Sequence, residues 1–319
     1  MVRYLLRRLP SALLVLFLSS ILIFLVMRLV PGDPAVALAG PDATPESLAA
    51  IRHSLGLDQS LPQQYLSWIG HVLTFDLGRS YVLGGQTSEL VISGLADTAV
   101  LAGAALLVAV TVALVASVAT VVWPTRPLTA LIGAAGTAAV ALPPFVTGVL
   151  LVLVFAVAVP VLPSGGVPPD GLLAAPDLTV QYLLLPALCL ALPVAAALTR
   201  FLTEALRTEM ARPYVTTARA AGMSRWQLVT RTALRNALPT TVTALGLQTG
   251  QLLGGAVLVE AIFAWPGIGQ LLQEGIGRRD YPVVQVLLLI SVAVFVAIQL
   301  VTDLVHAYLD PRIRIGGAT

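Results

Sequence analysis

The sequence predicts an all-α protein that crosses a membrane several times. Hydrophobic residues make up 57% of the 319 residues, charged residues make up 11%, and the mean hydropathy is +0.91. Soluble domains carry roughly 25% charged residues. A helix needs about 20 apolar residues to cross a hydrocarbon layer of about 30 Å, and six stretches of the chain are long and apolar enough. Backbone groups inside a membrane must be satisfied internally, so these stretches are predicted to be helical.

Six predicted transmembrane helices divide the chain into three regions. Residues 1–30 hold a cytoplasmic N-terminus and the first transmembrane helix, residues 31–95 form an extracytoplasmic segment with short helices, and residues 96–319 hold the other five. Three arginines before the first apolar run also resemble a signal peptide, but the run is longer than the apolar region of one, which favours a retained helix. The predicted transmembrane helices are Leu9–Leu29, Ala96–Val122, Leu128–Val159, Tyr182–Leu202, Ala237–Val259 and Val283–Leu304.

All eighteen basic residues are arginine, and their distribution predicts the orientation. Cytoplasmic loops of membrane proteins carry an excess of positive charge. With the N-terminus inside, thirteen arginines fall on the cytoplasmic side and five on the other, so both termini are predicted to be cytoplasmic. The thirteen are Arg3, Arg7, Arg8, Arg126, Arg200, Arg207, Arg212, Arg219, Arg225, Arg231, Arg235, Arg312 and Arg314, and the five are Arg28, Arg52, Arg79, Arg278 and Arg279.

Two stretches within residues 31–95 have the apolar spacing of short helices. PESLAAIRHSLGL begins at Pro45, and LPQQYLSWIGHVL begins at Leu61 and carries Tyr65 and Trp68. The preceding PGDP sequence at 31–34 is expected to end the first helix. We expect the two short helices at the outer membrane surface. They either form a lid packed on the spans or offer a docking surface to an external partner.

The stretch from Tyr214 to Gly222 reads as a short helix with its own start and stop, between the fourth and fifth spans. Pro213 suits the first turn of a helix, where its missing N–H is harmless. Gly222 suits the left-handed position just after a helix end. Ser224 and Gln227 have the spacing of a capping box that opens the next helix. Alanines in this short helix permit close docking against another protein.

The fifth span carries two sets of residues with a predicted role. Gly246, Gly250 and Gly254 lie four residues apart on one helix face, which favours close packing against another helix. Polar side chains in a membrane either line a wet cavity or bridge helices. Both roles stay open for the candidate pore-lining residues Thr241, Gln248 and Gln251.

Three features near the ends and middle of spans have mainly structural interpretations. Pro143 and Pro144 are expected to break or kink the third span, as a hinge, a pore-facing bend or a static packing kink. Glu260 is expected near the outer interface, where solvation is easy, with a structural hydrogen bond or a contact to Arg278 or Arg279. The AWPGIG sequence that starts at Ala264 predicts a turn or the start of a short re-entrant helix at the outer mouth.

Several kinds of chemistry find no support in the residue pattern. Cys189 is the single cysteine, so no intramolecular disulfide or cysteine metal site is possible. His53, His71 and His306 lack the spacing of metal ligands, and no pairing of residues indicates an active site. The net charge of +2 gives no indication of nucleic-acid binding. Without lysine the chain has no Walker A motif, so an ATP-driven process would need an ATPase on another chain.

Sequence motifs along the whole chain resemble one family of bacterial membrane proteins. TARAAG from Thr217, LRNALP from Leu234 and LLGGAVLVEAIFAWPGIG from Leu252 resemble the B-type permease subunits of ABC importers for dipeptides, oligopeptides and nickel. RYLLRRLP, VPGDP, LGLDQSLPQQYLSW, FDLGRS, RDYPVVQ and LDPRIR also resemble that branch, in the same order. The general permease motif begins with Glu-Ala-Ala, where this chain has Thr216, Thr217 and Ala218.

The resemblance implies a type I importer permease fold with a cytoplasmic coupling helix near 213–222. It implies a pore shared with a second homologous permease subunit, two ABC ATPase subunits or domains that use ATP and Mg²⁺, and an extracytoplasmic peptide-binding protein. The permease itself would bind no cofactor and catalyse no reaction, and it would lie in the bacterial plasma (inner) membrane. The residues expected to couple to the ATPase are Tyr214, Thr216, Thr217, Ala218, Arg219, Ala220, Ala221 and Gly222.

The predicted substrate is a dipeptide or oligopeptide, with nickel or glutathione as the alternative within the same family. A stand-alone secondary transporter is a second class of function, and it would call for acidic residues within spans or an inverted repeat. An intramembrane enzyme is a third class, and it would call for paired catalytic residues within spans. The sequence favours neither.

Overall fold

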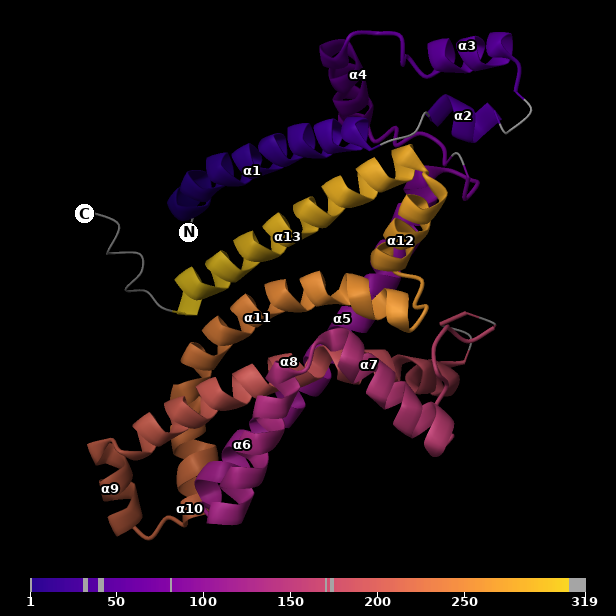
Figure 1. The fold of residues 1–319 in the computed structure, drawn as a ribbon. Helices are drawn as coiled ribbons and strands as arrows, with labels where there is room; N and C mark the ends of the chain where they lie inside the picture. The colour runs from indigo at the N-terminus through magenta and orange to yellow at the C-terminus, as the bar shows by residue number, and fades with distance from the viewer. Residues whose placement is uncertain are drawn as a thin grey trace. The chain divides into compact units, whose positions relative to one another are not determined.

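The computed structural model describes residues 2–30, 34–39, 43–80, 82–169, 171–172 and 175–309, which are almost entirely helical (Figure 1). Within these ranges the one bridge between extended residues joins Arg79 to Gln86. Two segments, η1 (Leu153–Ala158) and η2 (Leu228–Ala233), have the wider π-helical winding. The α-helices are α1 (Val2–Leu29), α2 (Pro34–Ala39), α3 (Pro45–Ser54), α4 (Leu61–Leu73), α5 (Thr87–Val122), α6 (Arg126–Ala141), α7 (Pro144–Val152), α8 (Pro176–Met210), α9 (Pro213–Ala220), α10 (Arg225–Gln227), α11 (Leu234–Ile262), α12 (Ile268–Arg278) and α13 (Tyr281–Leu309).

Five helices of the described chain are long and apolar enough to cross a membrane, and a bent pair brings the number to six if it counts as one span. This agrees with the predicted all-α, multi-pass architecture. The predicted PGDP stop at 31–34 and the terminal LDPRIR sequence fall partly outside the described residues. The five spanning stretches are Arg8–Leu29, Thr87–Val122, Pro176–Met210, Ala244–Ile262 and Tyr281–Leu304.

The predicted span Leu128–Val159 consists of two helices, which count as one span if the bent pair crosses the membrane once. Arg126–Ala141 and Pro144–Ala158 meet at an angle of 110°. Proline disfavours the helical conformation of the residue before it, and two consecutive prolines apply this to both Leu142 and Pro143. Their backbones are accordingly extended, with ψ of 126° and 144°. The two prolines therefore break the helix rather than kink it.

The helices form two compact units whose boundaries fall within α5 and α13. One unit contains the described residues up to Tyr4, Ala99–Trp265 and the described residues from Ile298 onward, and the other contains Leu5–Thr98 with Pro266–Ala297. In the first unit α8 is the central helix and packs against α6, α7 and α11.

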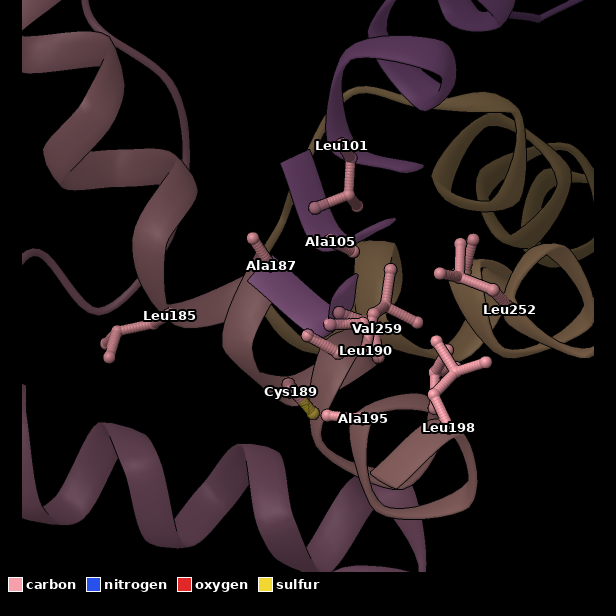
Figure 2. Close-up of a cluster of buried hydrophobic side chains, with 14 of the residues drawn as sticks. Leu101, Ala105, Leu185, Ala187, Cys189, Leu190, Ala195, Leu198, Leu252 and Val259 are labelled. Carbon is pink, nitrogen blue, oxygen red and sulfur yellow. The ribbon is translucent and has the colours of Figure 1, made fainter. Parts of the chain in front are cut away.

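The main core of the first unit surrounds the middle of α8, which contributes residues from most of its circumference (Figure 2). Leu190 and Leu198 of α8 meet Leu101 of α5 and Val259 of α11, and alanines between these larger side chains allow close approach of the helices. Cys189 lies in the same cluster, where its Sγ–H donates to the Pro144 carbonyl at 3.3 Å. This thiol thus satisfies a backbone group beside the break between α6 and α7.

In the second unit the short helix α4 packs against α1. The Tyr65 and Ser20 hydroxyls lie 2.8 Å apart, and the Phe24 ring contacts the rings of Tyr65 and Trp68 at centroid distances of 5.5 and 6.1 Å. The two predicted short helices are confirmed as α3 and α4. The aromatic contacts support the lid interpretation of α4, whereas a docking role for the segment stays a prediction.

Candidate coupling segment between α8 and α11

The segment between α8 and α11 contains the predicted short helix, α9 (Figure 1). Arg212 has an extended backbone, with φ −72° and ψ 149°, and Pro213 occupies the first turn. The proline ring fixes a φ suited to helix entry, and its missing N–H would have no partner within the helix there. The expected helix start is therefore confirmed.

A Schellman motif ends α9. Gly222 has φ of +89°, the Gly222 N–H donates to the Arg219 carbonyl at 3.0 Å, and the Met223 N–H donates to the Ala218 carbonyl at 3.2 Å. These two bonds satisfy carbonyls that the last helical turn leaves without partners. A left-handed backbone at this position favours glycine, so the prediction for Gly222 is confirmed.

The following helix opens with the predicted capping box. The Ser224 hydroxyl accepts from the Gln227 N–H at 3.3 Å, and the Gln227 side chain accepts from the Ser224 N–H at 3.0 Å. Helical structure then runs without interruption through α10, η2 and α11. Both ends of the loop after α9 are thus fixed by local hydrogen bonds.

Most of α9 presents small side chains at the surface. Val215 is buried, with 1% exposure, and holds the helix on the unit beneath it. Ala218 is half-buried, while Thr216, Thr217, Arg219, Ala220, Ala221 and Gly222 are exposed. An exposed face of alanine, glycine and threonine with one arginine is shallow enough for a second protein surface to approach the helix closely.

Tyr214, by contrast, makes hydrogen bonds within the chain. Its hydroxyl donates to the Glu209 carboxylate at 2.5 Å and accepts from the Asn236 side-chain amide at 3.1 Å. Arg212 lies 3.7 Å from the same carboxylate. Partial burial and the hydrogen bond to Glu209 raise the pKa of the Tyr214 phenol. Tyr214 therefore joins the start of α9 to the last turn of α8 and the first turn of α11.

Two contacts at the start of α10 went unnoticed in the sequence. The Arg225 Nε–H donates to the Val121 carbonyl at 2.8 Å, and the rings of Trp226 and Trp123 lie 6.0 Å apart at an angle of 32°. Both partners lie at the end of α5, about a hundred residues earlier in the chain. A local signal for them exists: Arg225 puts a cation in the first turn of a helix, where the helix dipole favours an anion.

The three glycines of the fifth span differ in their surroundings. A Cβ on Gly246 would lie 2.3 Å from Thr302 Cγ2, so α11 and α13 approach closely at this point. A Cβ on Gly254 would meet nothing within 4 Å, and Gly250 is half-buried. A Cβ on the neighbouring Gly255 would instead lie 3.4 Å from Cδ2 of Leu190 in α8. The shared face thus contacts a helix of this unit at Gly246 and is open at Gly254.

The candidate pore-lining residues lie on the same helix. Thr241 is half-buried, and its hydroxyl donates to the Ala237 carbonyl of its own helix at 3.0 Å. Gln248 is half-buried and Gln251 is exposed. An amide on an exposed part of a transmembrane helix needs water or a partner protein nearby. A pore-lining role for these residues stays a prediction.

The C-terminal end of α11 requires one correction. Glu260 is fully buried, with 0% exposure, and so does not lie in an easily solvated position. Helix α11 ends just beyond it, where the Glu260 carbonyl accepts from the Trp265 N–H at 2.9 Å and Ala264 has φ of +48°. The tight turn folds the chain back beside Glu260 and buries it. The predicted turn in AWPGIG is confirmed.

In the second unit Asp280 is a buried anchor that sequence reasoning did not single out. Its carboxylate accepts from the Ser80 hydroxyl and from the N–H groups of Val82 and Leu83, the latter two at 3.0 and 3.3 Å. The Ser80 hydroxyl in turn accepts from the Leu83 and Gly84 N–H groups at 2.8 and 3.1 Å. The FDLGRS and RDYPVVQ motifs thus meet at this carboxylate.

Long apolar helices, a broken helix pair and an exposed, capped helix between two spans define a multi-pass membrane permease subunit. The chain belongs to the family described as "Binding-protein-dependent transport system inner membrane component", which it matches over residues 109–315. Residues 1–93 match the family described as "Binding-prot-dependent transport system membrane comp, N-term". The chain is therefore a permease subunit of an ABC importer, which sets aside the stand-alone transporter and the intramembrane enzyme.

Similar proteins extend over nearly the whole chain. The glutathione transport system permease protein GsiC of Salmonella typhimurium is 36% identical over 314 residues, which cover 98% of this chain and 99% of the relative. The protein of the same description from Escherichia coli (strain K12) is 35% identical with the same coverage.

Among the described residues no group of three or more His, Cys, Asp or Glu side chains could hold a metal ion.

Proposed function

We propose that this chain forms half of a translocation pore for small peptides, with a second homologous permease subunit as the other half. Membership of the importer family implies ATPase and binding-protein partners. The single observation that carries the proposal further is α9: a short helix, fixed at both ends by caps, that exposes small side chains between two spans. Such a helix suits a cleft on a separate ATPase subunit.

The ATPase contact is assigned to the exposed side of the segment. Thr216, Thr217 and Arg219 supply polar contacts, while Ala220 and Gly222 let the partner approach the backbone. ATP and Mg²⁺ are used by the partner subunits, because a chain without lysine has no phosphate-binding P-loop of its own. Closure of the two ATPases on ATP would move α9 and, through it, the spans.

The excess of arginine on one side supports placing α9 and both termini in the cytoplasm. Residues 31–95 would then face the outside of a bacterial plasma membrane, where an extracytoplasmic binding protein delivers the substrate. Thr241, Gln248 and Gln251 are assigned to the pore surface. Neutral amides and hydroxyls suit a peptide path, because they hydrogen-bond peptide groups without selecting one charge.

Dipeptides and oligopeptides are the proposed substrate class, and glutathione is the second candidate. The second candidate is favoured by relatives at 35% and 36% identity that are described as glutathione transport permeases. Glutathione is itself a tripeptide with an unusual first linkage. One neutral, polar path therefore admits both glutathione and ordinary small peptides. Discrimination between them then falls to the binding protein.

Uptake by proteoliposomes tests the proposal. The chain is co-expressed with candidate second permease, ATPase and binding-protein subunits, and uptake of a labelled tripeptide or labelled glutathione is followed with and without ATP. Uptake that needs both ATP and the ATPase subunits is expected. Uptake that persists when the ATPase subunits are left out would refute the proposal, and competition between the two labelled compounds ranks them as substrates.

A further inference from the structure

Arg225 and Trp226 hold the start of α10 against the end of α5. Each makes its contact within the same unit: Arg225 with the Val121 carbonyl at 2.8 Å, and Trp226 with the Trp123 ring at 6.0 Å. We call these four residues the α5 clasp. Trp123 and Trp226 are half exposed, at 55% and 51%. The clasp therefore lies at the surface rather than in the core.

Arg225 stabilises α5, the helix that it contacts, rather than α10, the helix that it begins. The last four carbonyls of a helix have no partner within it, and Val121 is the second-last residue of α5. A guanidinium at that end satisfies a carbonyl and meets the negative pole of the helix dipole. In its own helix the same charge lies at the unfavourable positive end. The contact with α5 thus explains why an arginine occupies residue 225, where the dipole of α10 disfavours a cation.

Beneath the clasp the ends of three long helices share one apolar cluster. Val121 and Val122 of α5 pack there with Leu202 and Leu206 of α8 and with Val229 of η2. Buried interiors are closely packed and transmit displacement rather than absorb it. A movement of α10 is therefore passed to the end of α5 as a displacement of a packed body.

The Tyr214 hydroxyl already joins α9 directly to Asn236 in the first turn of α11. The covalent path along the chain from α9 into α11 is longer. It passes through η2, the π-helical segment Leu228–Ala233, which begins two residues after Trp226. π-Helical turns within α-helices are uncommon and concentrate at functional positions. The buried side chains of η2 lie in the same packed cluster as the end of α5. The clasp adds a direct contact between α10 and α5.

We propose that Arg225 and Trp226 are positioning residues that transmit movement of the ATPase-docking helix α9 to α5. This proposal rests on the proposed function of α9, because it assumes that the ATPase moves that helix. The movement is then transmitted through a contact between distant parts of the chain, and the docking surface itself is not involved in this step. Removal of the clasp should leave ATPase binding intact and lower the number of substrate molecules moved per ATP.

The test uses the complete importer in proteoliposomes, with labelled tripeptide and labelled glutathione as the probes. Arg225→Gln shortens the side chain and removes its charge, Arg225→Lys keeps the charge, and Arg231→Gln is the matched control at an exposed arginine in η2. Uptake, ATP hydrolysis and the ATPase content of the purified complex are measured for each. We expect Arg225→Gln to lower uptake per ATP at least about fivefold, a typical scale of coupling between sites, with partial recovery in Arg225→Lys.

The tryptophan pair supplies an independent test. Trp226→Ala and Trp123→Ala should each lower uptake per ATP, and the double variant should be no worse than the more severe single one, because both remove the same contact. Trp226→Phe keeps a stacked ring and should retain most of the coupling. Additive losses in the double variant would mean two separate membrane-interface anchors, which overturns the proposal.

The remaining outcomes are equally decisive. Unchanged uptake per ATP in Arg225→Gln, alongside a wild-type importer that works, would overturn the clasp and leave the proposed function standing. Loss of the ATPase from the purified Arg225→Gln complex would make Arg225 part of the docking surface, and would also overturn it. A wild-type complex with no ATP-dependent uptake of either probe would refute the proposed function itself.

Discussion

Gly246 and Thr302 bring α11 and α13 into close contact: a Cβ at position 246 would lie 2.3 Å from Thr302 Cγ2. The threonine is buried, with 6% exposure, and its β-branched side chain has few alternative rotamers in a helix. The contact therefore depends on the absence of a side chain at residue 246.

Gly246→Ala should destabilise the purified permease by about 1–3 kcal/mol, the usual effect of overpacking a close contact. Thermal unfolding in detergent measures the change. Gly254→Ala is the matched control, because a Cβ there meets nothing within 4 Å. Thr302→Ser removes the clashing methyl group and should restore much of the stability in combination with Gly246→Ala. Equal effects of the two glycine substitutions would contradict the assigned contact.

Gly222→Ala tests the left-handed end of α9. The new Cβ meets nothing within 4 Å, so any effect comes from the φ of +89° rather than from a clash. A left-handed backbone costs about 1–2 kcal/mol in residues with a Cβ. Amide hydrogen exchange of Gly222 and Met223, whose N–H groups close the Schellman motif, should accelerate by about tenfold. Gly222→Asn should have a smaller effect, and exchange that is unaltered in Gly222→Ala would argue against the motif.

Asp280→Asn tests the buried anchor in the second unit. The carboxylate accepts from two backbone N–H groups and one hydroxyl. A hydrogen bond to a charged group contributes about 1.5–3 kcal/mol to the free energy of unfolding. We expect a loss of stability of about 2–3 kcal/mol and faster proteolysis of the loop around Leu83. Glu46→Gln, an exposed acidic residue of α3, should change neither. If Asp280→Asn behaves like that control, the anchor is not required.

The pKa of Tyr214 predicts a dependence on alkaline pH. Partial burial and the hydrogen bond to Glu209 raise this pKa, so the folded state favours the neutral phenol. The resulting stability is fully present below the ordinary tyrosine pKa of about 10, and it is lost as pH rises through the higher folded value. The difference in thermal stability between wild type and Tyr214→Phe should be constant up to about pH 9 and shrink above it. A difference that does not change with alkaline pH would mean that the phenol has no such role.

Local signals in the sequence predicted the start and end of α9 and the cap of the next helix well. Pro213, Gly222 and Ser224 act through hydrogen bonds and dihedral angles that reach three to five residues along the chain, so their roles can be inferred without knowledge of the fold. Pro143 and Pro144 likewise predicted a break or a kink, and the structure shows a break. How far the chain turns there depends on how α6 and α7 pack on α8, which the prolines do not encode.

Contacts between distant parts of the chain could not be inferred in this way. Arg225 and Val121 lie 104 residues apart, and Asp280 and Ser80 lie 200 residues apart. Helical periodicity put Gly246 and Gly254 on one face, but it does not say which neighbour that face meets at each level. Glu260 was misplaced for the same reason, because its burial depends on a turn that folds the chain back beside it.

Cys189 has a practical consequence for experiments on this transporter. It is the single cysteine, it is 1% exposed, and its Sγ–H is hydrogen-bonded to the Pro144 carbonyl. Thiol-directed dyes and spin labels will therefore react slowly with the native chain. A cysteine introduced at Ala211, an exposed residue just before α9 and outside the proposed ATPase contact, would carry the label almost alone. The movement proposed for α9 during ATP turnover can thus be tested spectroscopically without first replacing the native thiol.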